Sequence, residues 1–174
     1  MEITTLVLLL MLPLLVWRIY SRLKKLMGRN PSTLWHHYAA AVLLPLALGV
    51  LAAQLLGSPL GLLALLLGAG AGAGLGWWNM KLSRLENTRE GFFYTPNLQL
   101  GMLVSLLFIG RLLYRGFELY LQMHEGTPLP PGEFHQSPLT VLPFAALAAF
   151  YACYHLLLLR WRRGQKPLAP LPQP

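Results

Sequence analysis

The feature that most limits how this chain can fold is the run Gly-Ala-Gly-Ala-Gly-Ala-Gly-Leu-Gly from Gly68 to Gly76. It lies inside Leu60 to Trp78, a stretch with no charged residue. In water such a helix would be poor, because each glycine costs about 1 kcal/mol relative to alanine. In lipid the backbone must satisfy its own hydrogen bonds, and small residues let neighbouring helices approach closely. The run therefore predicts a transmembrane helix that packs tightly against others.

The glycines of this run fall on two helix faces. Gly68, Gly72 and Gly76 share one face, and Gly70 and Gly74 share another. We expect all five to be helix-packing positions.

A dinucleotide-binding loop is the alternative interpretation, because Gly68, Gly70 and Ala73 match the pattern G-x-G-x-x-A. That motif needs a preceding strand and an acidic residue at a set distance after it. The sequence offers neither, so close helix packing is favoured.

The composition is that of a membrane protein. Hydrophobic residues make up 55% of the chain and charged residues only 11%, against about 25% charged in soluble domains. The net charge of +8 could indicate nucleic acid. However, the basic residues cluster at the ends of apolar segments, where they set orientation. We therefore expect the lipid bilayer as the environment and no nucleic-acid partner.

The apolar segments predict an all-α integral membrane protein, a five-span helical bundle forming one domain over residues 1–163. The predicted spans are residues 3–20, 34–56, 60–80, 97–120 and 138–160. The polar segment 81–96 predicts a small surface β-hairpin, because apolar and aromatic residues flank a turn-like centre. Residues 164–174 contain four prolines and are expected to be disordered.

The distribution of charge predicts the orientation. Twelve of the fourteen Lys and Arg residues fall on one side of this arrangement. All five tryptophans lie at the ends of spans on the same side. The positive side of a membrane protein is cytoplasmic. We therefore expect an N-out/C-in, multi-pass protein of the bacterial inner membrane.

Residues able to bind metal or haem are few. Cys153 is the only cysteine, which excludes a C-x-x-C redox pair within the chain. His36, His37 and His155 could lie at one depth and bind haem or a metal, but an interfacial or helix-bonding role is favoured, since nothing fixes a ligand spacing. The zinc-site alternative at His124-Glu125 and Glu133-x-His135 is likewise weaker than a plain loop. No cofactor is expected.

Arg111 is the candidate functional residue, because the fourth span is too short unless it continues through this arginine. Arg115 and Glu118 fall on the same helix face, and Tyr114 lies near it. The charged trio of Arg111, Arg115 and Glu118 predicts either an intramembrane site or a set of snorkelling interfacial anchors.

From about residue 77 to 163 the chain resembles the CcdC-like membrane proteins, a family of unknown function. The matching pieces are Lys81-Leu-Ser-Arg-Leu-Glu86, Gly91-Phe-Phe-Tyr94, Leu106-Leu-Phe-Ile-Gly-Arg111 and Arg160-Trp-Arg-Arg163. The resemblance places Arg111 at the family's intramembrane arginine. The family's name implies a link to cytochrome c maturation, without an activity.

Three functions remain open at this point. The first is a non-enzymatic accessory, scaffold or assembly factor with a membrane-protein partner or a second copy of itself. The second is a small oligomeric transporter or channel that uses Arg111. The third is a haem or metal protein that uses the histidines. The absence of a nucleophile motif, a phosphate loop or paired intramembrane carboxylates favours the first.

Overall fold

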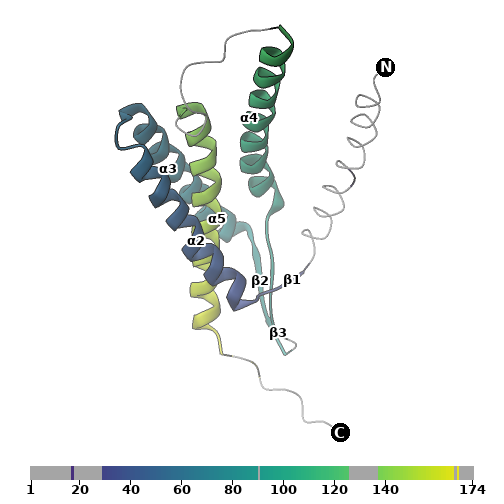
Figure 1. Cartoon of the computed structure of the whole chain (residues 1–174). Coiled ribbons are helices and arrows are strands. Elements are labelled where there is room, and N and C mark those ends of the chain that lie inside the picture. The colour runs from purple at the N-terminus through teal and green to yellow at the C-terminus, as the bar shows by residue number, and fades with distance from the viewer. Residues whose placement is uncertain (1–16, 18–28, 90, 126–136, 167, 169–174) are drawn as a thin grey trace.

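The computed structural model describes residues 29–89, 91–125 and 137–166, together with Trp17 and Leu168. In this part of the chain, four long helices and three short strands follow in the order β1-α2-α3-β2-β3-α4-α5 (Figure 1). The helices are α2 (Leu34–Gln54), α3 (Pro59–Leu82), α4 (Leu98–Glu125) and α5 (Pro138–Gly164). The strands are β1 (Asn30–Pro31), β2 (Arg84–Thr88) and β3 (Gly91–Thr95).

All four described helices are long and apolar enough to cross a membrane, which agrees with an integral membrane protein. The described residues give four such helices rather than five, so the predicted five-span count is not supported. The predicted first span, residues 3–20, lies outside them apart from Trp17. The other four spans occur close to their predicted bounds, although α4 continues beyond residue 120 to Glu125.

The start of α3 follows directly from its local sequence. Ser58 occupies the N-cap position, and its hydroxyl accepts a hydrogen bond from the Gly61 amide at 3.2 Å. Pro59 follows at the first helical position, where its missing N–H costs nothing. The Gly57–Pro59 segment thus turns the chain from α2 directly into the glycine-rich helix.

Helices α3 and α5 form the most extensive contact between the described elements, and the glycine run makes it possible. Gly68, Gly72 and Gly76 are buried. A Cβ atom on any of them would lie closer than 3.0 Å to a backbone carbonyl oxygen of α5, those of Leu142, Ala146 and Phe150 respectively. The two helices run parallel, because both sets of residues advance in steps of four in the same direction.

The other two glycines of the run lie on a different face. A Cβ on Gly70 or Gly74 would meet nothing within 4 Å. Of the two glycine faces, only the one formed by residues 68, 72 and 76 therefore touches another described helix. The run lies in the middle of a 24-residue helix and follows no strand, which excludes the dinucleotide-loop interpretation.

The hydrophobic core lies along α5. Leu55, Leu65, Val141 and Ala145 are buried together where α2, α3 and α5 meet. A second cluster joins Val104 of α4 to Ala146 and Phe150 of α5. Helix α5 is the most buried of the four helices and α4 the least.

The predicted hairpin at 81–96 is present as β2 and β3, with Glu86 opposite Phe93. Gly91 begins β3 with a φ of +131°, a conformation that favours glycine. Strand β1 was not predicted from the sequence. It pairs antiparallel with β3 and makes a three-stranded sheet in the order β1-β3-β2.

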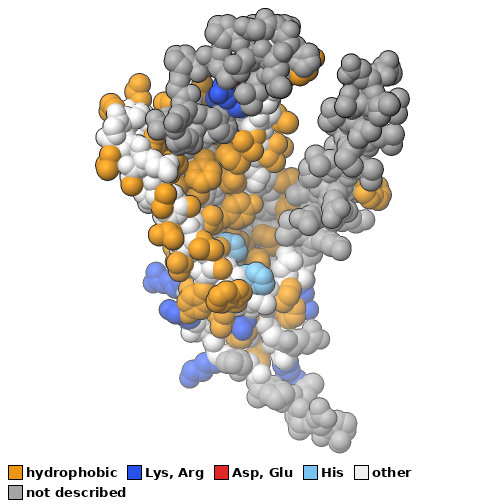
Figure 2. Space-filling view, viewed as in Figure 1, with side chains coloured by type: hydrophobic (Ala, Val, Ile, Leu, Met, Phe, Trp, Pro, Cys, Tyr) orange, Lys and Arg blue, Asp and Glu red, His pale blue; other side chains and the backbone are white. Residues whose placement is uncertain are grey.

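The sheet packs at one end of the bundle, below α4 in Figure 1. Arg29 pairs with Glu86 at 2.8 Å, and Arg162 of α5 lies 3.7 Å from the centre of the Phe92 ring. Asn87 donates to the carbonyl of Lys166 at 3.1 Å, which holds the start of the predicted disordered tail against β2. Lys and Arg side chains gather at this end of the molecule (Figure 2).

Candidate functional site

Two histidines that are 118 residues apart in sequence meet at the sheet end of the bundle. Nδ1 of His37, near the start of α2, lies 2.9 Å from Nδ1 of His155 on α5. The ring centroids are 5.2 Å apart, and His37 is only 1% exposed. One of these two nitrogens must carry a hydrogen and the other must accept it.

The second ring nitrogen of His37 is also engaged. Its Nε2 lies 2.9 Å from the hydroxyl of Ser32, a buried residue whose amide donates to the Phe92 carbonyl of the sheet. The edge of the His37 ring also meets Tyr94 of β3. Burial raises the pKa of the Tyr94 hydroxyl, which therefore stays a neutral phenol at physiological pH. The result is a hydrogen-bonded chain from Ser32 through His37 to His155.

A cavity of about 360 Å³ opens beside this chain, between α4 and the α3–α5 pair. Its wall at the sheet end includes Asn79, Tyr94, Tyr154 and His155. Farther along α4 the lining turns apolar, with Met102, Leu106 and Ile109. None of the described residues that line it is an Asp, Glu, Lys or Arg.

Asn79 is the most unusual polar residue of this cavity. It is 2% exposed, and its Oδ1 has no hydrogen-bond partner among the described residues. Most buried polar atoms in proteins are hydrogen-bonded. Nearby, the Tyr154 hydroxyl lies 3.0 Å from that of Ser83, which donates to the Asn79 carbonyl.

The residues predicted from the fourth span come together near the opposite end of the bundle. Arg115 Nη1 lies 2.9 Å from Glu118 Oε2, and Arg111 Nη1 lies 4.0 Å from the same oxygen. Arg111 also donates from Nε to the Thr140 hydroxyl on α5 at 3.2 Å. Tyr114 is largely exposed, with its ring centre 5.4 Å from the Arg111 guanidinium carbon.

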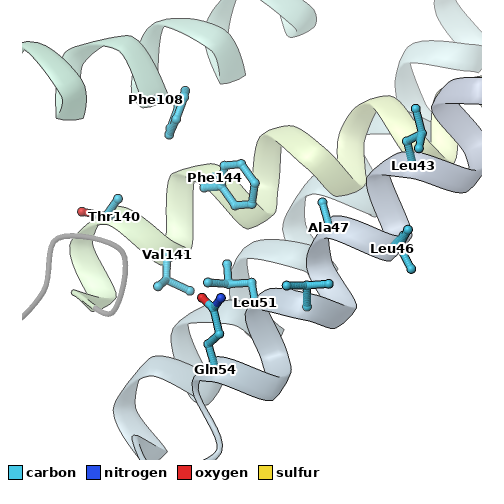
Figure 3. A pocket seen from close by; sticks show the side chains of 10 residues that line it. Leu43, Leu46, Ala47, Leu51, Gln54, Phe108, Thr140, Val141 and Phe144 are labelled. Carbon is cyan, nitrogen blue, oxygen red and sulfur yellow. The ribbon is translucent and has the colours of Figure 1, made fainter.

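A second cavity, of about 460 Å³, lies between α2, α5 and α4 (Figure 3). Apolar side chains line nearly all of it, among them Leu43, Leu51, Phe108 and Phe144. Gln54 and Thr140 supply its polar groups at one end. Its described lining has no polar cluster comparable to the Ser32–His37–His155 chain.

The described residues contain no group of three or more His, Cys, Asp or Glu side chains able to hold a metal ion. His36 is exposed and contacts Thr33 of its own turn, so it does not join His37 and His155. Glu133 and His135, and the side chains of His124 and Glu125, lie outside what the structure describes.

Sequence reasoning paired the histidines only by depth and missed Asn79, Ser32 and Tyr94. The sequence does give one indication for Asn79, because it is a polar side chain directly after the uncharged stretch Leu60 to Trp78. Ser32 lies in the polar connector before α2, and its hydroxyl bonds a histidine ring. The pairing of β1 with β3 and the position of α5 bring these side chains next to His37, and neither was visible in the sequence.

Comparisons with known proteins agree with the resemblance drawn from the sequence. A family model described as CcdC protein matches residues 1–167, which include the glycine run and the loop before α5. No curated protein and no solved structure matches the chain. Because the match covers nearly the whole sequence and the described helices suit a membrane, the chain belongs to the CcdC protein family.

Proposed function

We propose that this chain is a non-enzymatic accessory protein of the bacterial inner membrane, an assembly factor that holds a partner helix against α3. The chain belongs to the CcdC protein family, and that resemblance implies cytochrome c maturation as the process that the chain assists. The orientation that fits this role is N-out/C-in. The sheet end, where eight of the ten described Lys and Arg residues lie, then faces the cytoplasm.

The observation that supports a partner helix is the open glycine face of α3. Gly70 and Gly74 form a G-x-x-x-G pair, and a Cβ atom added to either would have nothing within 4 Å. Exposed large side chains border this pair, including Leu66, Leu67 and Trp78. Small residues between large ones make a shallow groove in which a second helix backbone can approach closely.

The α3–α5 contact illustrates what such a groove does. Along the other face of α3, glycines at the same four-residue spacing bring the α5 backbone into direct contact. Association of helices in lipid depends on this kind of close packing, since burial of apolar surface gives no net gain there. Helix α3 therefore offers one occupied groove and one groove that no described residue fills.

The test is a comparison of associated proteins after purification in mild detergent. We expect the double variant Gly70→Leu/Gly74→Leu to lose a membrane-protein partner or a second copy that the native protein retains. Gly49→Leu is the matched control, because Gly49 on α2 also has nothing within 4 Å but has no second glycine four residues away. Unchanged association in the double variant would contradict the proposal.

The link to cytochrome c needs a separate test. A strain that lacks the chain is expected to contain less haem-stained cytochrome c than its parent, and the native gene should restore the level. The double variant should fail to restore it, whereas Gly49→Leu should succeed. A normal cytochrome c level in the deletion strain would remove this link and leave the helix-binding role to be judged by association.

The transporter alternative has weaker support. It needs the charge of Arg111 to attract an anion, but Glu118 lies 4.0 Å away and Thr140 accepts a hydrogen bond from the guanidinium. Arg111 and Arg115 share the Glu118 carboxylate, an arrangement that suits an anchor near the membrane surface. The trio fits attachment of α4 to α5 better than it fits an anion site.

A further inference from the structure

The 360 Å³ cavity between α4 and α5 has the form of a site for an amphiphile. Its volume falls within the range of about 300–1,000 Å³ typical of ligand pockets. Hydrogen-bonding groups occupy the sheet end, and Met102, Leu106 and Ile109 continue along one face of α4 toward the middle of the bundle. Leu106 is 63% and Ile109 43% exposed, so the apolar end opens to the surroundings of the bundle.

Asn79 identifies the polar end as a binding surface. Its buried Oδ1 has no hydrogen-bond partner among the described residues, which is costly unless a ligand or water supplies a donor. The side chain is one of those that line the cavity. Oδ1 itself has almost no accessible surface, so a ligand hydroxyl would satisfy it once the amide turns toward the cavity.

His155 gives the polar end a group that can donate or accept. In one arrangement Ser32 donates to His37 Nε2, His37 Nδ1–H donates to His155 Nδ1, and His155 Nε2 carries a hydrogen. In the other, every hydrogen bond is reversed and His155 Nε2 accepts. Both rings are neutral in both arrangements, so His155 can present either a donor or an acceptor without a charge in the bundle.

The rings beside His155 suit a flat ligand. The ring planes of Phe150 and Tyr154 lie within 10° of each other, with centroids 6.5 Å apart, and Tyr151 stacks on His155. The absence of Lys and Arg from the described lining disfavours a phospholipid, whose phosphate would need a cation. The ligand chemistry that fits is a neutral ring with oxygen groups and an apolar tail.

We propose that this cavity binds the head of an isoprenoid quinone, held by Asn79 and His155, with the tail leaving along α4 into lipid. The oxidised head has carbonyl oxygens that accept from His155 Nε2–H. The reduced head has hydroxyls that donate to Asn79 Oδ1 and to His155 Nε2. This inference does not depend on the partner-helix role, because the open face of α3 plays no part in it.

Two measurements on the detergent-purified full-length protein test binding. The first quantifies quinone in an organic extract of the protein by absorbance and mass spectrometry. The second titrates decylubiquinone and its reduced form, decylubiquinol, into the protein by isothermal calorimetry. Asn79→Leu should weaken decylubiquinol binding about tenfold, because a buried ligand hydroxyl loses its acceptor. Ser105→Trp should abolish it by filling the cavity from α4, where Ser105 is one of the lining residues.

Gln54→Leu is the matched control, since it removes a polar group from the other cavity. It should leave quinone binding unchanged, which would show that the losses in the other variants are specific to the 360 Å³ cavity. Ser105→Trp lies outside the buried core, so it keeps the test usable if Asn79→Leu does not fold. Binding by folded Ser105→Trp equal to that of the native protein, or displacement of decylubiquinone by phosphatidylglycerol, would overturn the proposal.

The histidine chain has its own spectroscopic readout. In protein labelled with ¹⁵N-histidine, decylubiquinone should favour the tautomer of His155 with hydrogen on Nε2, and decylubiquinol the tautomer with hydrogen on Nδ1. His37 should switch in the same experiment, because the two rings share a hydrogen bond. Bound ligand with unchanged tautomers in both redox forms would contradict the role assigned to His155.

Discussion

Replacement of Gly72 by leucine should separate the two central helices. A Cβ at this position would overlap the carbonyl oxygen of Ala146 and lie 2.8 Å from both its carbonyl carbon and its Cα. These are backbone atoms, so no side chain can rotate away, and α3 must move from α5. The rest of the leucine side chain then needs further room within the same contact.

The cost can be estimated from overpacked cores, where added methylene groups destabilise by about 1–3 kcal/mol. The backbone contact places Gly72→Leu at the upper end, about 3 kcal/mol. For a chain of this size, 1 kcal/mol corresponds to about 2–4 °C in Tm. We therefore expect Tm in detergent to fall by roughly 6–12 °C.

Gly70→Leu is the matched control, the same substitution two residues away on the same helix. Its Cβ enters open space. Leucine also favours the helix over glycine by roughly 0.8 kcal/mol. Its Tm should equal or slightly exceed the native value, as followed by circular dichroism. Equal Tm values for Gly72→Leu and Gly70→Leu would refute the assignment of the packing face.

Three further predictions concern the N-cap of α3, the contact between α4 and α5, and the orientation in the membrane. Ser58→Ala should lower the free energy of unfolding by about 1 kcal/mol, measured by thermal melting, because α3 loses its N-cap. Arg111→Ala should lower Tm more than Arg115→Ala, since Arg111 bonds Thr140 of α5, a contact worth about 1 kcal/mol; equal values would make both arginines surface anchors. A reporter fused after Pro174 should be cytoplasmic and one in the loop between α4 and α5 external, and the opposite pattern would reverse the proposed orientation.

The helices were predictable because their causes are local. Uncharged stretches of about 20 residues predict spans, and Ser58-Pro59 marks the start of α3. The bounds differ by a few residues where the end is not fixed by composition, as in α4, which continues past its last apolar run to Glu125.

The glycine faces were predictable only as a pair. Periodicity divides the run into two faces, but it cannot say which face meets a neighbour within the chain. The position of α5 decides this, because its small residues Ala145 and Ala146 lie where α3 approaches. Gly70 and Gly74 carry the same local signal, yet no described residue packs against them.

The polar cluster at the sheet end could not be derived from sequence order. His37 and His155 meet because the start of α2 and the last part of α5 lie at the same level of the bundle. Ser32 reaches them because β1 pairs with β3. A two-residue strand has almost no sequence signature, so the contact that places Ser32 was not predictable.

The most direct test of the central claim is disulfide cross-linking in native membranes. With Cys153 replaced by alanine, a single cysteine is placed at Gly74 or, as the control, at Gly49. After oxidation with copper phenanthroline we expect a disulfide from position 74, to the same position of a second copy or to a cysteine of a partner helix, and none from position 49. Equal cross-linking at both positions would contradict a helix-binding role for the open face of α3.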